Sequence, residues 1–593
     1  MATPQVDSSS LKTAGQEPEA TEVDDRKILS DERVLKNLGY EPVLHRTYNQ
    51  FHNFSTTFAA LCFIGGVRVT FSTGIAAGGN LAYWVTFLIS CVFTFITAAV
   101  IAEVCSSLPL AGSIYLWAAE SGGPKYGRLF GFVVAWWSTT AWTTFCASNT
   151  QAAVNYMLSE IVVFDLDFPS DASSVKFRAI QWICTEILLA LACILNLLPP
   201  RFFRWIFYAS SILVMVDFLL NMIWLPIGTS QTYGFRTAHE AFMTTYNGTG
   251  APPIWNVCLS FLATAGILIG FDASGHVAEE TKNAPVAAAR GIFWSTITSG
   301  IGGFVCVVLF LFCVPDADTL FSFGGAQPFV PLYAVILGKG GHIFMNIINI
   351  TCLWFNTAIA VLAASRLVFA VARDGALPFS GWVAQVVNGQ PKNAVVVVWV
   401  VAAIITCTIL PSSVAFTSLV SAAGVPSAAA YGLICFGRVF ITPEKFPEPR
   451  WSLGKWSRPF QIIGIFWNAW VVAVLFSPYE FPVTGATLNL IPYQDPIAKD
   501  SGPDVSSTMS QTLPMAAIFM RNRYIGWAAV VFSIQNWLGE SEYNKTNSST
   551  PGYFSVGMAL MSLVVTYLPM FLPPPPGSQG LPTGTEAAAP VTA

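Results

Sequence analysis

The 593-residue chain is too apolar for a set of soluble domains. Hydrophobic residues make up 54% of it and charged residues only 10%, whereas a soluble protein carries about 25% charged residues to solvate its surface. The mean hydropathy is +0.57. The 29 basic and 33 acidic residues leave a net charge of −4, so no basic excess favours binding to nucleic acid. The composition indicates a polytopic membrane protein.

Residues 1–50 are polar and contain no apolar run of the kind that a signal peptide needs, so they are predicted to form a disordered cytosolic tail. Apolar segments follow, each near the ~20 residues that a membrane-spanning helix requires. The fold class is therefore predicted to be all-α and polytopic. Eleven segments are predicted, at 53–78, 82–106, 128–157, 179–198, 203–228, 254–279, 292–314, 342–370, 394–410, 415–436 and 460–477.

The basic residues between these segments predict the orientation of the chain. With the N-terminus in the cytosol, the internal loops hold most of the Lys and Arg residues. The external loops hold only Lys176, Arg178, Arg236 and Lys339. The positive-inside rule favours this orientation. It places the sequon Asn247-Gly248-Thr249 outside the cell or in the lumen, which makes Asn247 a candidate glycosylation site.

A polar stretch at 480–510, rich in Pro, Ser, Asp and Thr, separates this body from a different C-terminal unit. That unit has apolar runs at 511–520, 524–538 and 553–572, which predict two or three further membrane helices. The Pro-rich end at 573–593 is predicted to be disordered.

Two helices contain short segments that predict a break. These segments are 64–67 (IGGV) and 269–272 (IGFD), and they lie five helices apart, as expected of inverted repeats that unwind at the bilayer midplane. A break inside hydrocarbon is tolerated only where it lines a cavity. The half-helix ends would bind the carboxylate and the ammonium group of an amino acid. The alternative is that the glycines only allow close packing, but the matched pair favours a substrate site.

Ionisable residues inside membrane helices are the next signal, because each costs roughly 2.5–3.5 kcal/mol at a helix centre. Arg68 follows the first break, and its two alternatives are pairing with a substrate carboxylate or a structural ion pair. Asp217, near the middle of its helix, is the best candidate for proton coupling; the alternative is a hydrogen bond to a neighbouring helix.

Five further residues carry weaker predictions. Asp272 is predicted to cap the second half of its helix rather than to couple ions. Glu103 and Arg366 lie near cytosolic helix ends, where a structural or gating salt bridge is expected. His276 is expected to make a helix-packing contact, and Phe271 is either an aromatic gate over the substrate or a packing residue.

Nothing in the sequence indicates catalysis or a cofactor. The chain has no P-loop, no HExxH motif and no Ser-His-Asp set, which argues against an ATP-driven pump and against an enzyme. Its twelve cysteines lie in apolar runs without a CxxC pair. They predict small buried hydrophobes, with neither a disulfide framework nor a metal site.

Three motifs carry a family resemblance. Residues 102–115 (AEVCSSLPLAGSIY) resemble a signature of the amino acid–polyamine–organocation permeases. Residues 270–273 (GFDA) with 278–281 (AEET) resemble helix 6 of the fungal amino acid/choline transporter branch. Residues 365–369 (SRLVF) with 372–378 (ARDGALP) are similar to the end of helix 8 in that branch. The resemblance covers residues 51–489.

This resemblance implies a five-plus-five inverted-repeat fold and proton-driven uptake of amino acids or related amines by alternating access. It places the substrate contacts on Gly65, Gly66 and Val67 in helix 1 and on Gly270 and Phe271 in helix 6. Arg68 is unusual at its position, so the substrate stays open among neutral amino acids, γ-aminobutyrate, choline and polyamines. The implied partners are substrate, proton and lipid bilayer, and the plasma membrane is favoured over the vacuolar or endoplasmic-reticulum membrane.

The C-terminal unit has a different resemblance. Residues 491–493 (IPY), 502–504 (GPD) and 523–528 (RYIGWA), with Ser562 and 567–568 (YL), resemble Asterix, the small subunit of an endoplasmic-reticulum chaperone complex for multipass membrane proteins. This implies a permease domain without the usual twelfth helix, an Asterix-like membrane segment at 490–572, and a second candidate function as a membrane-protein biogenesis factor through that chaperone complex.

Overall fold

A computed structural model of the chain describes Leu44, residues 46–411, 415–443, 446–479 and 481, and parts of 527–534 and 552–571. The chain divides into two units, Met1–Thr484 and Gly485–Ala593. The predicted N-terminal tail, the polar stretch at 480–510, the apolar run at 511–520 and the Pro-rich end lie wholly or almost wholly outside the described residues.

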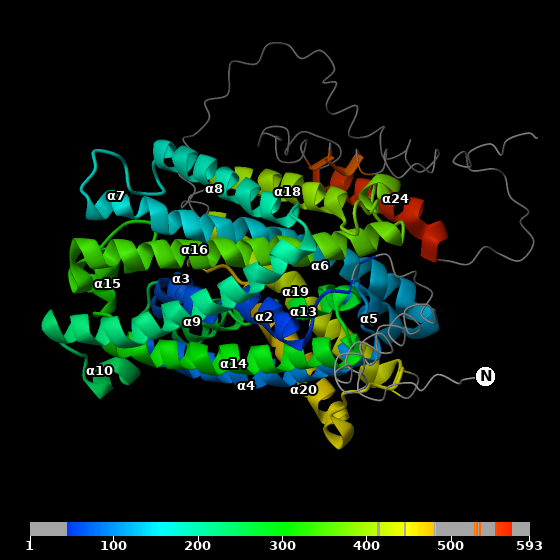
Figure 1. Ribbon diagram of the computed structural model, residues 1–593, viewed down its shortest axis with the longest axis horizontal. Coiled ribbons are helices and arrows are strands. Elements are labelled where there is room, and N and C mark those ends of the chain that lie inside the picture. Colours follow the sequence, from blue (N-terminus) through cyan, green and yellow to red (C-terminus); the bar gives the residue numbers. More distant parts are fainter. Residues whose placement is uncertain are drawn as a thin grey trace, which may run out of the picture. The chain divides into compact units, whose positions relative to one another are not determined.

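The described part of the first unit is built from helices (Figure 1). Its first half contains α2 (Gln50–Leu61), α3 (Phe63–Ala76), α4 (Gly79–Ser107), α5 (Ser113–Ser121), α6 (Gly123–Leu158), α7 (Glu160–Val163), α8 (Val175–Asn196), α9 (Pro200–Gln231) and α10 (Ala238–Met243).

The second half begins with another interrupted helix. It contains α11 (Pro253–Leu259), α12 (Phe261–Gly266), α13 (Ala273–His276), η1 (Ala278–Glu280), α14 (Ala284–Cys313), α15 (Ala317–Ser322), α16 (Phe329–Arg373), α17 (Ser380–Val383), α18 (Lys392–Thr406), η2 (Cys407–Ile409), α19 (Ala415–Phe440), η3 (Gly454–Trp456) and α20 (Ser457–Leu475).

All eleven predicted segments fall on these helices or interrupted helices. Within the described residues, nine helices have the length and apolar composition to cross a membrane. Helix α6 is long enough but is not among the nine, because its buried face carries many polar side chains. Those buried polar side chains include Ser138, Thr143, Thr144, Ser148, Thr150, Gln151 and Asn155. The prediction of an all-helical polytopic membrane fold is confirmed.

The first predicted break lies earlier than expected. Helix α2 starts with a capping box, in which Asn49 Oδ1 accepts from the backbone N–H of His52 and His52 Nδ1 accepts from that of Asn49. It ends at Cys62, whose φ of 38° and ψ of 56° are left-handed. Residues 64–67, predicted to unwind, are helical within α3. The prediction was wrong by a few residues, because the distortion is confined to Cys62.

The two glycines of that segment have a packing role. A Cβ at Gly65 would lie 2.8 Å from Cys62 Sγ and 3.3 Å from Leu353 Cδ2. A Cβ at Gly66 would lie 3.0 Å from Ile267 Cγ2. The missing side chains therefore let α3 approach both α16 and the second interrupted helix, as in other membrane helices that pack on small residues.

The second break lies where the sequence predicts it. Helix α12 ends at Gly266, and the chain is irregular through Asp272 until α13 begins. Gly270 has a φ of +95°, a conformation that only glycine adopts without strain. This stretch is a true unwound segment inside the bundle.

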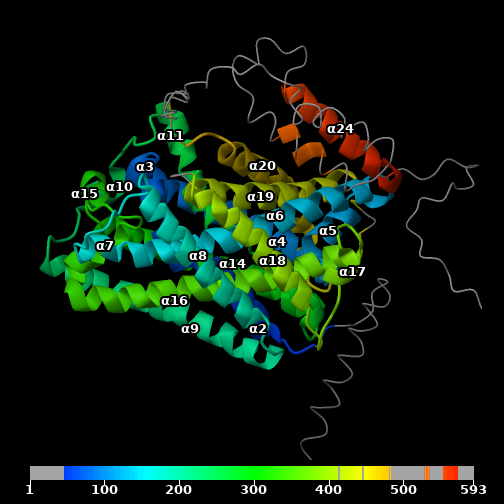
Figure 2. The same cartoon turned by 90° about the horizontal axis from the view of Figure 1, so that it is seen from above.

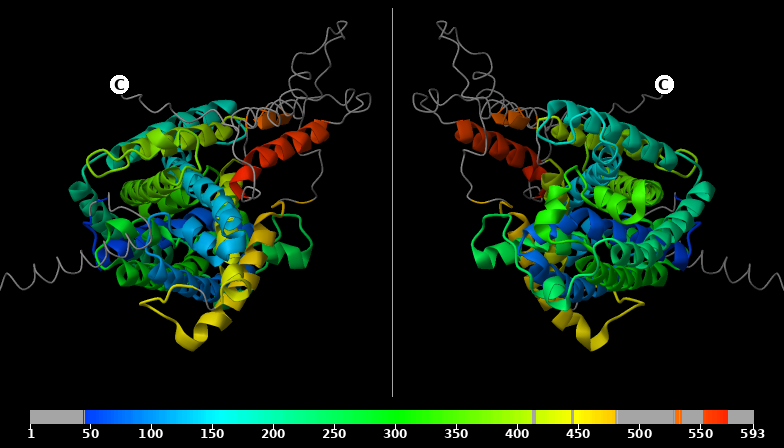
Figure 3. Two further views of the ribbon diagram at one scale, coloured as in Figure 1. Left: turned by 90° about the vertical axis from the view of Figure 1, so that its right-hand side faces the viewer. Right: turned by 90° about the vertical axis from the view of Figure 1, so that its left-hand side faces the viewer.

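The interrupted helices occupy the interior of the first unit. Helices α2, α3 and α13 each pack against both α14 and α16. Figures 1 and 2 show the short helices α2 and α3 among the long helices α9, α14 and α16, and Figure 3 gives the same unit from its two ends. Helix α16 itself is interrupted at Gly338, which has φ 69° and ψ 170°.

The second unit is described only in part. It contains α24 (Gly552–Phe571), which coincides with the apolar run predicted at 553–572. Ala529 and Val530 pack with Ala559 and Leu563 of this helix.

Candidate functional site

A cavity lies where the two interrupted helices meet. The centres of water-sized molecules can occupy about 80 Å³ of it, and the space between its atoms, counting the part that is open to solvent, is about 670 Å³. Its walls come from the end of α2, from α3, from the unwound segment after α12, and from α6, α16 and α19. Its lining includes Cys62, Gly66, Phe145, Asn149 and Asn356. The structure therefore places a cavity at the pair of breaks, as the sequence predicts.

A chain of amides connects three of these helices at the cavity. Asn149 Nδ2 of α6 donates to Asn356 Oδ1 of α16 at 2.5 Å. Asn356 Nδ2 in turn donates to the backbone carbonyls of Ala59 and Ala60, both at 2.9 Å. These carbonyls belong to the last turn of α2, where backbone acceptors lack partners within the helix. Asn356 thus holds the end of α2 at the cavity wall.

The ends of interrupted helices lie at the cavity wall. Leu61 and Gly266, the last residues of α2 and α12, both line it, so the carbonyl ends of two helices point toward it. Such ends carry partial negative charge. None of the described lining residues is Asp, Glu, Lys, Arg or His. The remaining polar groups are hydroxyls and amides, and Phe145 contributes an aromatic ring.

Only some of the predicted substrate-contact residues lie at the cavity. Gly66 lines the cavity, and Gly270 lies beside it, because its absent side chain would meet Trp142 and Phe145 at 3.7 and 3.8 Å. Val67 is fully buried in the apolar core. Phe271 stacks on Tyr431 with ring centroids 4.5 Å apart, away from the cavity lining. Substrate contact by these residues stays a prediction.

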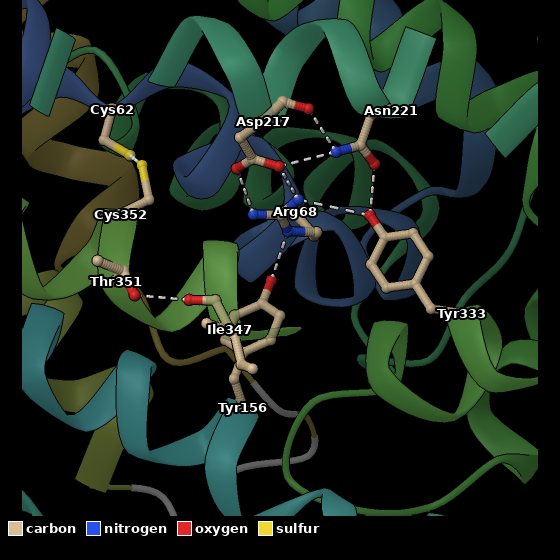
Figure 4. Close-up of polar contacts among 9 residues, drawn as sticks. All are labelled: Cys62, Arg68, Tyr156, Asp217, Asn221, Tyr333, Ile347, Thr351 and Cys352. Carbon is tan, nitrogen blue, oxygen red and sulfur yellow. Dashed lines mark hydrogen bonds and ion pairs between the residues drawn. The ribbon is translucent and has the colours of Figure 1, made fainter. Parts of the chain in front are cut away.

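Arg68 and Asp217 form a bidentate ion pair inside the bundle (Figure 4). Arg68 Nη1 lies 2.9 Å from Asp217 Oδ1, and Arg68 Nη2 lies 2.8 Å from Asp217 Oδ2. Both side chains are completely buried. The pair connects α3 to α9. It is the structural ion pair that was the alternative role for Arg68, and the contact with a neighbouring helix that was the alternative role for Asp217.

Three further polar side chains surround this pair. Arg68 Nε donates to the hydroxyl of Tyr156 at 2.8 Å. Asn221 Nδ2 donates to Asp217 Oδ1 at 2.8 Å, and the Tyr333 hydroxyl donates to Asn221 Oδ1 at 2.5 Å (Figure 4). The network therefore joins α3, α6, α9 and α16. A buried ion pair is stable only when its remaining hydrogen-bonding capacity is met in this way.

Asp272 lies in a second buried cluster and does not cap α13, so the predicted capping role is wrong. Its carboxylate accepts from the Tyr431 hydroxyl at 2.6 Å and from Trp142 Nε1 at 3.3 Å. His276 Nε2 lies 3.0 Å from Asp272 Oδ2, and His276 Nδ1 lies 2.8 Å from Ser113 Oγ. Partners on α6 and α19 hold the side chain away from the amides of α13.

Arg366 makes the salt bridge that the sequence predicts. Its Nε lies 2.8 Å from Glu280 Oε1, with both side chains buried. The neighbouring Glu279 pairs with Arg373 at 3.1 Å and accepts from the backbone N–H of Ala111 at 3.0 Å. Glu279 thus connects α16 to the loop before α5, and Glu280 connects α16 to η1. A gating role for these contacts stays a prediction.

Glu103 does not form the salt bridge that the sequence predicts. Its carboxylate accepts from Leu453 N at 2.9 Å, from Ser452 Oγ at 3.0 Å and from Ser457 Oγ at 2.5 Å, and within the described residues it forms no ion pair. Glu103 therefore connects α4 to the turn before α20 through neutral donors. Hydroxyl and amide donors on that turn satisfy the carboxylate where a basic residue was expected.

Asn247 is exposed, as a glycosylation acceptor must be, and its Nδ2 donates to Ala251 O at 2.9 Å. Thr249 of the same sequon is buried, and its Oγ1 donates to Asn256 Oδ1 at 2.7 Å. Glycosylation of Asn247 stays a prediction. Among the residues that the structure describes, no group of three or more His, Cys, Asp or Glu side chains is arranged to hold a metal ion.

Several residues at the cavity were not found by sequence reasoning. Phe145, Asn149 and Asn356 lie in ordinary apolar helices, and Cys62 looks like any other membrane cysteine. The two asparagines carry a usable signal, since polar amides inside membrane helices usually face a cavity or a neighbouring helix. Cys62 and Phe145 give no such signal.

A bundle of membrane helices with two interrupted helices around a central cavity is the architecture of a membrane transporter. A sequence model described as amino acid permease matches residues 51–497, and the chain belongs to this family. The match extends slightly past Asn489, where the permease pattern was expected to stop.

The relatives divide between two kinds of substrate. The chain is 50% identical over 486 residues to the thiamine transporter thi9 of Schizosaccharomyces pombe, a match that covers 78% of this chain and 82% of that protein. It is 27% identical to the amino-acid permease BAT1 of Arabidopsis thaliana, covering 77% and 90%. A crystal structure of the Eremococcus coleocola manganese transporter matches with a TM-score of 0.47 and 11% identity, covering 88% of this chain and 94% of that one.

The first prediction tests the cavity. Gly66→Leu places a side chain where Ile267 Cγ2 already lies 3.0 Å from a Cβ, so it should fill the space between the interrupted helices. Uptake of substrate should be lost while the amount of protein in the membrane is unchanged. Gly340→Leu is the matched control, because a Cβ there meets nothing within 4 Å. Undiminished uptake by Gly66→Leu would remove this cavity from the transport path.

The second prediction tests the buried ion pair. Arg68→Met leaves Asp217 as an unpaired buried charge and should cost about 3–5 kcal/mol of stability, as should Asp217→Leu. The double variant removes both charges and should recover most of that loss. The measurement is the thermal unfolding midpoint of purified protein in detergent. A double variant no more stable than the two single variants would show that the pair is not the source of the loss.

Proposed function

We propose that this permease is a proton-coupled secondary transporter that carries an organic cation, with thiamine as the first candidate, by alternating access through the cavity at the interrupted helices. The observation that carries the proposal is the chemistry of that cavity. It combines the carbonyl ends of two helices, amide groups and an aromatic ring, and its described lining contains no charged side chain.

This lining suits a cationic substrate. Helix carbonyl ends attract positive charge, and an aromatic face such as that of Phe145 is attracted to an organic cation. Asn149 uses its Nδ2 to bind Asn356, which leaves its carbonyl oxygen as an acceptor for a substrate N–H group. A heteroaromatic cation with an amino group offers partners for all three features.

The buried ion pair argues against one role for Arg68. Both of its terminal nitrogens bind Asp217, so the guanidinium is occupied and is not among the cavity lining. A substrate carboxylate would therefore depend on the amide end of α3 alone. Amino acids, γ-aminobutyrate, choline and polyamines remain the competing substrates, and the carboxylate-bearing ones fit the cavity less well. The identity with thiamine transporter thi9 supports the same choice.

We place proton coupling at Asp272 and His276 rather than at Asp217. An imidazole is the side chain whose charge ordinarily changes between pH 5 and 8. The Asp272–His276 pair directly follows the unwound segment, so its protonation acts on the backbone beside the cavity. Asp217 is held by both terminal nitrogens of Arg68, and this closed contact suits a structural role.

Most of the other ionisable groups around α13 have partners of their own. Glu280 pairs with Arg366, and Glu279 pairs with Arg373. His52 on α2 is part of a capping box, the Tyr115 hydroxyl on α5 donates to Asp374 at 2.7 Å, and the buried Cys105 thiol lies on α4. Arg290 on α14 is exposed. The Asp272–His276 pair is therefore the titratable unit closest to the unwound backbone.

The distribution of basic residues favours an N-terminus in the cytosol. We propose the plasma membrane as the setting, because the proposed activity is uptake. The Asterix-like resemblance of the C-terminal unit stays a prediction, since residues 482–526 lie outside the described part of the chain. None of the described residues supports the biogenesis function, so transport is the function that we propose.

The third prediction concerns the substrate. Cells that lack their own thiamine uptake should accumulate labelled thiamine when they express the full chain, and the uptake should saturate. Choline and polyamines should compete weakly, and neutral amino acids and γ-aminobutyrate less still, because their carboxylates lack a partner in the cavity. Asn149→Leu should reduce uptake, whereas Asn393→Leu, which changes a half-buried asparagine outside the cavity, should not. Strong uptake of a neutral amino acid without thiamine uptake would contradict the proposal.

The fourth prediction concerns coupling. Uptake by the natural protein should rise as the external pH falls, because protonation of the Asp272–His276 pair accompanies inward transport. His276→Gln and Asp272→Asn should abolish this pH-driven accumulation while sparing exchange of labelled for unlabelled substrate. Asp217→Asn should instead lower the amount of folded protein. Accumulation by His276→Gln that still rises as pH falls, together with its loss in Asp217→Asn, would assign coupling to Asp217.

A further inference from the structure

Two buried thiols meet at the break in the first helix. Cys62 Sγ lies 3.3 Å from Cys352 Sγ of α16 (Figure 4). Both residues are buried, and no third His, Cys, Asp or Glu side chain joins them among the described residues. No other pair of cysteines in the described part of the chain has its sulfurs in contact. The pair is therefore a dithiol rather than a metal site.

The position of Cys62 gives this dithiol access to the transport path. Cys62 is the single left-handed residue between α2 and α3, so it is the point about which the two half-helices change direction. It also lines the cavity. Cys352 lies on α16, one turn before Asn356, whose amide holds the last carbonyls of α2. A reagent that enters the cavity therefore reaches Cys62, and α16 with Cys352 lies directly beside it.

We propose that Cys62 and Cys352 form a redox-sensitive modification site, at which a two-electron oxidant of the peroxide class links the thiols and stops transport. Each thiol gives up its proton, the pair gives up two electrons to form one S–S bond, and the peroxide is reduced to two molecules of water. The sulfurs must approach from 3.3 Å to about 2.05 Å, a shift smaller than one bond length.

The consequence follows from where the link is made. In a transporter with interrupted helices, access alternates when one group of helices rocks against another around the site. A covalent bond between the hinge of helix 1 and α16 fixes two elements that must move relative to each other. Oxidation therefore traps the transporter in one state, and a thiol reductant releases it.

This inference rests on the proposed function in one respect, since it takes the cavity as the transport path. Formation of the Cys62–Cys352 bond is measured without any substrate. Purified full-length protein is treated with hydrogen peroxide and digested without reduction. Mass spectrometry should find a peptide that joins Cys62 to Cys352. The thermal unfolding midpoint should rise, since the link closes a loop of 290 residues in the unfolded chain. Absence of the joined peptide would overturn the proposal.

Transport is then measured in cells or vesicles, with each variant compared with its own untreated uptake. Peroxide should abolish uptake by the natural protein, dithiothreitol should restore it, and substrate in the cavity should slow the loss. Cys352→Ser and Cys62→Ser should resist peroxide, whereas Cys435→Ser, which removes a buried thiol of α19, should stay sensitive. The proposal would be overturned if protein with the Cys62–Cys352 bond transported at the untreated rate. It would also be overturned if peroxide still inhibited Cys352→Ser. Failure to carry thiamine would reject the proposed substrate only. The joined peptide would still decide whether the two thiols form a link.

Discussion

The ion pair between Arg68 and Asp217 organises the half of the bundle that follows the first break. Two charges that are wholly removed from solvent require both mutual contact and saturated hydrogen bonding, and Tyr156, Tyr333 and Asn221 supply that saturation. Because these partners come from α3, α6, α9 and α16, the requirement fixes the relative positions of four helices. The second half of helix 1 is thus held by polar contacts that leave little freedom.

The first half of helix 1 is held differently, and this difference creates the cavity. Interrupting a helix in hydrocarbon exposes backbone carbonyls that must find partners. Asn356 satisfies two of them at the end of α2, and the unwound segment after α12 lies opposite. The remaining space is lined mainly by aliphatic side chains, with two amides, a few hydroxyl and thiol groups and one aromatic ring among them. The same constraint that makes a broken helix costly therefore brings backbone carbonyls, and the amide that pairs with them, to the cavity wall.

Two further clusters connect the interior to the ends of the helices. Asp272 and His276 directly follow the unwound segment and bind Trp142, Tyr431 and Ser113 on other helices. Beyond them, Glu279 and Glu280 bind two arginines of α16. The stretch from the unwound segment to η1 thus carries its buried carboxylates in two successive clusters, each held by side chains of other helices.

The sequence by itself determined the membrane class, the eleven apolar segments, the family and the second break, because these depend on local hydropathy and on short motifs. It also identified Arg68, Asp217 and Arg366 as buried charges. Only the tertiary structure decided their partners, since a charge does not indicate in sequence which distant charge it will meet. The tertiary structure also placed the first break at Cys62, whereas the sequence predicted it at Gly65 and Gly66. Sequence favours glycine at breaks, but here close packing against Leu353 and Ile267 required the glycines in a regular helix, and the left-handed turn fell on the preceding cysteine.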